Sequence, residues 1–177
     1  TVQATNAASI DLSNQTEDFD IAGSAGADTL VGGQGNDTIN GGLNSDVLTG
    51  GLGVDVFAVG AGVDTIADLG SGADVLTVAV GATANATLAN GWTATAGTNN
   101  RGTASIDAAG FDVNLTLADG TSANGWIITN SGTAAEIDGS GQNDTITGGA
   151  GDDNIDGNLG DDSISGGAGA DSFWVIN

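Results

Sequence analysis

The chain lacks histidine, cysteine, lysine, tyrosine, proline and methionine altogether. The first four supply most of the bases, nucleophiles and acids used in catalysis. We therefore expect no enzyme activity. A carboxylate pair could in principle hydrolyse glycosides, but the spacing of the aspartates favours a different role, described below. The absence of cysteine leaves the redox compartment open.

Basic charge is almost absent too. Against 23 acidic residues stands one basic residue, Arg101, which we interpret as a loop charge, and the formal net charge is −22. This balance excludes nucleic acid and anionic membranes as electrostatic partners, and it makes multivalent cations the natural counterions. No apolar run approaches the roughly 18 residues of a membrane span.

No N-terminal secretion signal is visible, because the residues after Thr1 form neither a basic nor an apolar leader segment. The missing methionine leads us to expect a processed product or a segment of a longer protein.

Glycine, by contrast, is abundant, and much of it falls in a nine-residue repeat, Gly-Gly-x-Gly-x-Asp-x-apolar-x. The repeat reads GGQGNDTIN at 32–40, GGLGVDVFA at 50–58 and GGAGDDNID at 148–156. Aligning on the apolar position gives a first block with aspartate-ending turns at 23–28, 32–37, 41–46, 50–55, 59–64 and 69–74. A second block has turns at 139–144, 148–153, 157–162 and 166–171. One inserted residue, Asp68, precedes the last turn of the first block.

Four segments follow from this alignment. Residues 1–22 keep the spacing while the turn chemistry fades, so we expect degenerate capping or docking rungs. Residues 23–78 and 139–177 are the two repeat blocks. Residues 79–138 contain short stretches rich in threonine, valine and isoleucine, and they form either an irregular β insert or longer solenoid rungs. Trp92, Trp126 and Trp174 are interpreted as core or interface anchors rather than carbohydrate platforms. No segment has helical periodicity.

Each repeat divides into a six-residue glycine-rich turn and a three-residue strand with one apolar side chain. A chain that reverses every nine residues completes a coil in eighteen, with its strands on two parallel sheets and the apolar side chains between them. The predicted fold class is therefore all-β, a parallel β-roll. Each aspartate then lies beside the aspartate eighteen residues on, and such carboxylates repel unless a cation lies between them. Calcium, which binds six to eight oxygens, fits carboxylates mixed with carbonyls.

The repeat resembles that of the RTX (repeats-in-toxin) calcium-binding β-roll family, most closely segments of bacterial surface-layer proteins or large adhesins exported by type I secretion. In that family, aspartates of turns eighteen residues apart share an ion. The resemblance implies the pairs Asp28–Asp46, Asp37–Asp55, Asp46–Asp64, Asp144–Asp162 and Asp153–Asp171. Asp55 and Asp74 are nineteen residues apart because of Asp68, so their pairing stays open.

The same resemblance implies backbone carbonyl ligands in these turns. In the first block they belong to Ser24, Gly26, Gly33, Gly35, Gly41, Gly42, Leu43, Asn44, Gly50, Leu52, Val59 and Ala61. In the second block they belong to Ser140, Gln142, Gly149, Gly151, Gly157, Leu159, Gly166 and Ala168. Asn44 and Gln142 stand where the family has its fourth-position glycine. Asparagine tolerates the left-handed region, whereas Gln142 fits the turn less well.

We therefore expect a calcium-binding structural protein of the bacterial cell exterior, such as a surface-layer, adhesin or fibre subunit, whose β-rolls fold on binding several Ca²⁺ ions. The alternative is the C-terminal folding and secretion module of a type I secreted enzyme or toxin. The ending Asp171 to Ile176 resembles the acidic-then-hydrophobic end of type I secretion signals. Asp162 and Asp171 would form half-sites at an open end, which predicts head-to-tail contact with copies of the chain or with other surface components.

Overall fold

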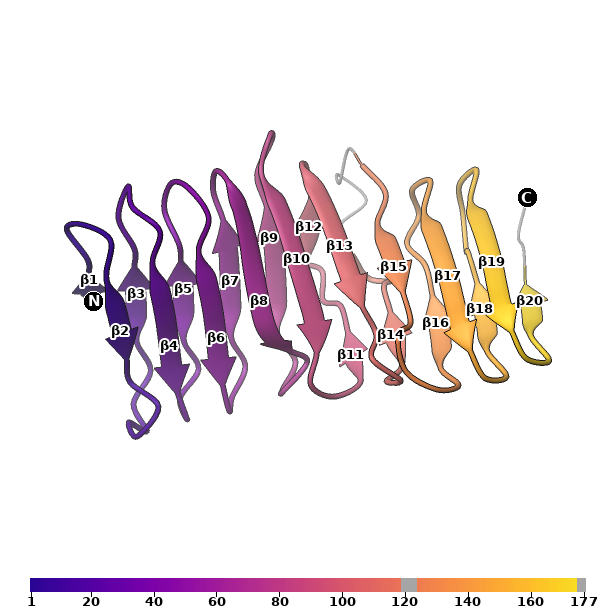
Figure 1. Ribbon diagram of the computed structural model, residues 1–177, viewed down its shortest axis with the longest axis horizontal. Coiled ribbons are helices and arrows are strands. Elements are labelled where there is room, and N and C mark those ends of the chain that lie inside the picture. The colour runs from indigo at the N-terminus through magenta and orange to yellow at the C-terminus, as the bar shows by residue number, and fades with distance from the viewer. Residues whose placement is uncertain (119–123, 175–177) are drawn as a thin grey trace.

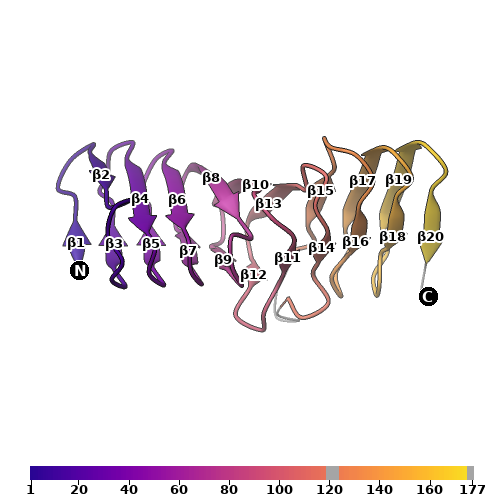
Figure 2. The ribbon, with the colours of Figure 1, turned by 90° about the horizontal axis from the view of Figure 1, so that it is seen from below.

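The computed structural model describes residues 1–118 and 124–174 as a single elongated solenoid, which contains twenty β-strands and no helix in these ranges. Its coils follow one another along the long axis, from the N-terminal end to the C-terminal end (Figure 1). Viewed from below, the strands form two layers (Figure 2). Every strand pair is parallel. The predicted parallel β-roll is confirmed.

One layer is a nine-stranded sheet that runs through both blocks and the residues between them. In spatial order its strands are β2 (Ser9–Asp11), β4 (Thr29–Gly33), β6 (Val47–Gly51), β8 (Val63–Leu69), β10 (Thr83–Leu88), β13 (Thr103–Asp107), β15 (Ile127–Thr129), β17 (Thr145–Ala150) and β19 (Ser163–Ala168).

The other layer consists of two sheets. The six-stranded sheet contains β1 (Val2–Gln3), β3 (Asp20–Ala22), β5 (Thr38–Asn40), β7 (Val56–Val59), β9 (Val75–Val78) and β12 (Asn99–Asn100). The five-stranded sheet contains β11 (Trp92–Thr93), β14 (Val113–Asn114), β16 (Glu136–Asp138), β18 (Asn154–Asp156) and β20 (Ser172–Trp174).

The core contains a row of apolar side chains along each inner face, and further buried residues such as Val59, Ala84 and Leu88 widen it. In the nine-stranded sheet, residues in direct register run from one end to the other: Ile10, Leu30, Leu48, Ile66, Ala86, Ile106, Ile128, Ile146 and Ile164. Opposite them lie Ile21, Ile39, Phe57 and Leu76, all fully buried. Full burial of one such side chain contributes roughly 1.5–3 kcal/mol, so the repeated apolar position supplies most of the hydrophobic stabilisation.

The length of a coil differs between the blocks and the residues between them. Partners within a block are eighteen residues apart, as in Leu30 with Leu48 and Ile146 with Ile164, except where the inserted Asp68 makes the separation nineteen. Between the blocks the separation rises to twenty for Thr83 with Thr103 and twenty-four for Val113 with Ile137. The strands of residues 79–138 pair directly with strands of both blocks. We call the coils formed by these residues the middle rungs.

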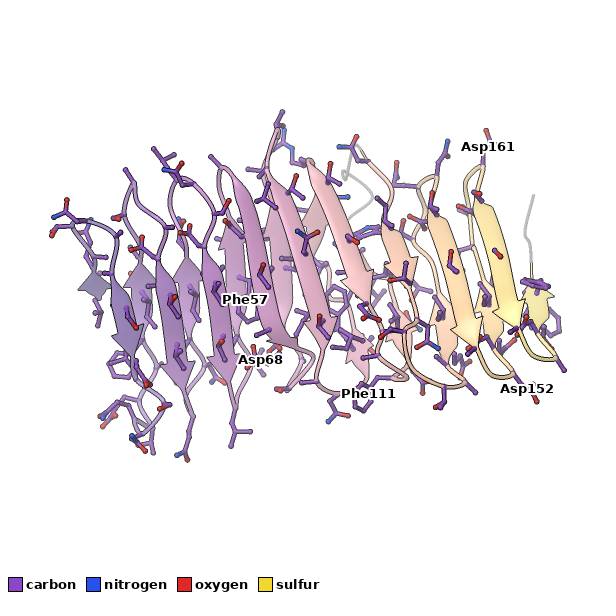
Figure 3. All side chains as sticks on the ribbon, viewed as in Figure 1. Phe57, Asp68, Phe111, Asp152 and Asp161 are labelled. Carbon is purple, nitrogen blue, oxygen red and sulfur yellow. The ribbon has the colours of Figure 1, made fainter. Side chains whose placement is uncertain are left out.

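The inserted residue Asp68 lies at the C-terminal end of β8, close to the end of β6 (Figure 3). Its carboxylate accepts the N–H groups of Gly50 and Gly51, at 2.9 and 2.8 Å. The opposite sheet keeps its register, with Phe57 paired to Leu76 nineteen residues on. The insertion is thus absorbed in one corner of the coil, and its side chain supplies the acceptors needed there.

The last described coil leaves its apolar side chains uncovered. Phe173 and Trp174 are 51% and 63% exposed, whereas Trp92 and Trp126 are almost fully buried. Trp92 and Trp126 are therefore core residues and Trp174 is not, while the interpretation of Trp174 as an interface anchor stays a prediction. Residues 175–176 of the ending that resembles a secretion signal lie outside the described residues. Among the described residues there is no helix long and apolar enough to cross a membrane.

Candidate metal centre: the aspartate columns

The aspartate-ending turns alternate between the two long edges of the solenoid, because the chain reverses direction after every strand. In Figure 3, Asp161 lies at the upper edge and Asp152 at the lower edge; each directly precedes the aspartate that ends its turn. The upper edge thus carries turns 23–28, 41–46, 59–64, 139–144 and 157–162. The lower edge carries turns 32–37, 50–55, 69–74, 148–153 and 166–171.

Along each edge the aspartates form columns joined by hydrogen bonds. The backbone N–H of one aspartate donates to Oδ1 of the aspartate in the next coil. The bonds are Asp28 to Asp46 (2.8 Å), Asp46 to Asp64 (3.0 Å), Asp37 to Asp55 (2.8 Å), Asp55 to Asp74 (2.9 Å), Asp144 to Asp162 (2.9 Å) and Asp153 to Asp171 (3.1 Å). The structure therefore brings together all five expected pairs. It also joins Asp55 to Asp74, because the insertion is absorbed elsewhere.

The second carboxylate oxygen has no such partner in most turns. Oδ2 is buried, with no hydrogen-bond partner among the described residues, in Asp37, Asp46, Asp55, Asp64, Asp153 and Asp162. A buried anionic oxygen without a donor is costly, and native proteins leave few such groups unsatisfied. These six atoms therefore need a ligand or a proton.

Position-one glycines make the space beside these oxygens. A Cβ built on Gly32 would lie 2.3 Å from Asp37 Oδ2 and 2.6 Å from the carbonyl oxygen of Gly50 in the next coil. One built on Gly148 would lie 2.6 Å from both Asp153 Oδ2 and the carbonyl oxygen of Gly166. Two acceptors thus face the same small space with no donor between them, an arrangement that suits a hard cation with oxygen ligands.

The raised pKa values of the column aspartates also indicate that a cation belongs there. Burial raises the pKa of Asp55 to about 7; the Asp37 N–H opposes this shift, and the carboxylates of Asp74, Asp37 and Asp68 add to it. Burial likewise raises the pKa of Asp64 to about 6, with the Asp46 carboxylate adding to the effect and the Asp46 N–H opposing it. Burial is also the main cause of the raised pKa values of Asp37, Asp46, Asp74 and Asp144. A divalent cation would remove this penalty.

In the part of the chain that the structure describes, side chains alone do not form a metal site. Within residues 1–118 and 124–174, no group of three or more histidine, cysteine, aspartate or glutamate side chains converges on one point. The predicted sites combine two carboxylates with backbone carbonyls, and calcium, unlike magnesium, accepts six to eight such oxygens in flexible geometry. The residues present therefore fit calcium, which when bound would neutralise the paired carboxylates.

The expected carbonyl ligands lie in the turns beside these columns, but some already accept a hydrogen bond. The carbonyls of Ser24 and Gly33 accept the N–H groups of Leu43 and Leu52, at 3.0 and 2.8 Å. Each carbonyl oxygen retains a second lone pair.

Each column begins with an apolar residue in the aspartate position, which the sequence analysis missed. The N–H groups of Ala8, Phe19, Trp126 and Ala135 donate to Oδ1 of Asp28, Asp37, Asp144 and Asp153, at 2.6 to 2.8 Å. Three of them lie eighteen residues before the first aspartate of their column, so the repeat period could have identified Phe19, Trp126 and Ala135.

Comparisons with known proteins agree with this geometry. The profile of the RTX calcium-binding nonapeptide repeat (four copies) matches residues 20–48, 32–66 and 138–173. The matches contain every turn-ending aspartate of the two blocks except Asp74, and they leave out residues 79–137 of the middle rungs. No curated protein and no solved structure matches the chain. The chain is thus a parallel β-roll with RTX calcium-binding nonapeptide repeats in both of its blocks.

Proposed function

We propose that this chain is a structural segment of the bacterial cell exterior, exported by type I secretion, whose two blocks fold when calcium joins the paired turns. The six buried Oδ2 atoms without a partner support the calcium-dependent folding, because they oppose folding until a cation reaches them; the location rests on the RTX repeats. The net charge of −22 keeps a calcium-free chain expanded through self-repulsion. Ion-binding energy then becomes folding energy.

Circular dichroism and sedimentation velocity, with calcium and with a chelator, test this proposal. In calcium we expect a compact chain with a strong β signal. In chelator we expect a larger hydrodynamic radius and a weaker β signal, because the blocks lose structure. A chain that is equally compact and equally β-rich in chelator contradicts the proposal. Magnesium at the same concentration is the control, because it demands near-octahedral geometry and gives up its water reluctantly.

Assembly through the C-terminal end is a finer part of the proposal. β19 and β20 are the outermost described strands of their sheets, and Phe173 and Trp174 are exposed on β20. Asp162 also has an Oδ2 without a partner. An open edge of this kind pairs readily with another β edge, and the occupant we propose is the β1 and β2 end of a second copy. Light scattering at millimolar calcium should show oligomers that Trp174→Asp abolishes, whereas a strict monomer contradicts this assembly.

A folding and secretion module of an exported enzyme or toxin is the second candidate. It is favoured by the exposed Phe173 and Trp174 directly after the acidic Asp171 turn. The full-length gene distinguishes the two candidates, since an active-site domain in the same reading frame supports the module and further β-roll or adhesive segments support the structural role.

A further inference from the structure

The opening turn of each block differs from the other turns in the same way. Turns 23–28 and 139–144 have serine at the second position, where the family pattern has glycine. The Ser24 N–H and hydroxyl both donate to Asp28 Oδ2, at 2.6 and 3.0 Å. The Ser140 N–H and hydroxyl donate to Asp144 Oδ2 at the same two distances. These oxygens are therefore already satisfied.

Each serine hydroxyl is held in place by its own turn. The N–H of Gly26 donates to Ser24 Oγ at 3.0 Å, and the N–H of Gln142 donates to Ser140 Oγ at 3.2 Å. The hydroxyl accepts this bond and donates a hydrogen bond to the carboxylate. The same relay occurs in two turns more than a hundred residues apart, which makes it a property of the serine turn.

The backbone of the opening turns is different as well. In turn 41–46 the second and fourth residues, Gly42 and Asn44, have φ of 102° and 71°, and in turn 148–153 Gly149 and Gly151 have φ of 94° and 113°. Neither the second nor the fourth residue of the opening turns has a positive φ. The N–H and C=O of a trans peptide point in opposite directions. Since the serine N–H points at the carboxylate, the preceding carbonyl points away from it.

We propose that Ser24 and Ser140 set the calcium stoichiometry of the two blocks. By donating to Asp28 and Asp144, they allow the pairs Asp28–Asp46 and Asp144–Asp162 to hold together without an ion. A cation there would have to displace two donors that already satisfy the carboxylate oxygen. Calcium is bound instead at the pairs whose first aspartate has a free Oδ2, which are Asp37–Asp55, Asp46–Asp64, Asp55–Asp74 and Asp153–Asp171. This inference rests on the proposed calcium-dependent folding.

The serine turns also give each block a first turn that is complete without calcium. Asp28 and Asp144 have donors on both carboxylate oxygens, because the N–H groups of Ala8 and Trp126 donate to their Oδ1 atoms. The first coil of each block can then form before calcium arrives, and its edge offers hydrogen-bonding groups to the next coil.

Substitution by the family residue tests the inference in the full chain. Ser24→Gly and Ser140→Gly remove the hydroxyl and let the turn adopt positive φ. Isothermal titration calorimetry with calcium chloride, combined with native mass spectrometry, should count one more bound ion in each variant and two more in the double variant. Ser45→Gly is the matched control, because Ser45 is exposed in turn 41–46 and should leave the count unchanged.

Hydrogen exchange in chelator provides a readout that does not depend on ion counting. The wild-type amides of Ser24 and Ser140 should exchange more slowly than those of Gly42 and Gly149, and this difference should vanish for the substituted residue in each variant. Unchanged ion counts in both variants, or equal exchange at these four amides in the wild type, overturn the inference. If the wild type binds no calcium, the proposed function itself fails.

Discussion

Asp55 in the first block and Asp107 in the middle rungs show how differently the two regions treat an aspartate. Asp55 is fully buried, has one oxygen without a partner, and has a pKa raised to about 7 by burial. Asp107 accepts the N–H groups of Ala109 and Ser131 and the Ser131 hydroxyl, at 3.0, 2.9 and 2.7 Å. Burial alone would raise its pKa, but these donors lower it below the usual value.

Neutral amides have a similar role elsewhere in the middle rungs. Asn130 is buried, and its Oδ1 accepts the N–H groups of Gly110 and Gly132 at 2.8 and 3.0 Å. Asn100 donates to the Gly125 carbonyl at 2.7 Å and accepts the Gly102 N–H at 3.2 Å. An asparagine carries both donors and acceptors, so it can close a turn without a counterion. The same solenoid thus has coils that need a cation and coils that are complete without one.

The largest expected effect is the response of the two regions to calcium removal. In chelator, backbone amides of the blocks should lose most of their protection from hydrogen exchange, because the aspartate columns repel one another. Amides of the middle rungs should retain more protection, since their turns are satisfied internally. Exchange monitored by mass spectrometry checks this, and uniform loss of protection along the chain would remove the distinction between the regions.

The buried tryptophan pair of the middle rungs should matter for stability whether calcium is present or not. Trp92 and Trp126 pack edge to face with ring centroids 6.2 Å apart, and Trp92 Nε1 donates to the Asp74 carbonyl at 2.9 Å. Trp126→Ala should cost about 3–5 kcal/mol of unfolding free energy. The exposed Trp174→Ala is the control and should cost little. Equal losses from the two substitutions in thermal denaturation would show that Trp126 is no core residue.

Exchanging one carboxylate for an amide should have opposite consequences in the two regions. Asp55→Asn removes a charge from two adjacent pairs, so the calcium midpoint of folding should rise about tenfold, as for a loss of about 1.4 kcal/mol. In chelator the same variant should be more stable than the wild type, because repulsion falls. Asp107→Asn should leave the calcium midpoint unchanged and cost about 1 kcal/mol. Calcium titrations followed by circular dichroism compare them, and a shifted midpoint in Asp107→Asn would count against the contrast.

A smaller effect is expected from pH in the absence of calcium. The folded-state pKa values of Asp55 and Asp64, about 7 and about 6, lie above the unfolded value of 3.8. The folded blocks therefore bind more protons than the unfolded chain, so their stability rises as pH falls from 8 to 5 and declines as pH rises through these values.

The contribution of Asp107 to stability depends on pH in the opposite direction, because its folded pKa is lowered. This stabilising contribution is lost only at still lower pH. Thermal denaturation in chelator at pH 5 and pH 8 measures the effect, and a block that is more stable at pH 8 would contradict it. With saturating calcium the sign should reverse, since protons compete with the ion.

The nonapeptide period was enough to predict much of the fold and of the site. Glycine-rich turns alternating with single apolar residues fix a coil of eighteen residues, and that coil places Asp37 beside Asp55 and Asp153 beside Asp171. The pairing of Asp55 with Asp74 could not be decided in this way. It depends on whether one corner of a coil can take up an extra residue, and the Asp68 carboxylate makes this possible by accepting two N–H groups.

The sequence by itself determined the β-roll, the two repeat blocks and the aspartates that face one another, because a strict period converts directly into a position on the coil. Only the tertiary structure decided which carboxylate oxygens are left without a donor. Ser24 and Ser140 satisfy theirs, Ala8 and Phe19 begin their columns, and Asn130 closes a coil of irregular length. These contacts depend on the direction in which single N–H and O–H groups point, and a repeat period does not specify that direction.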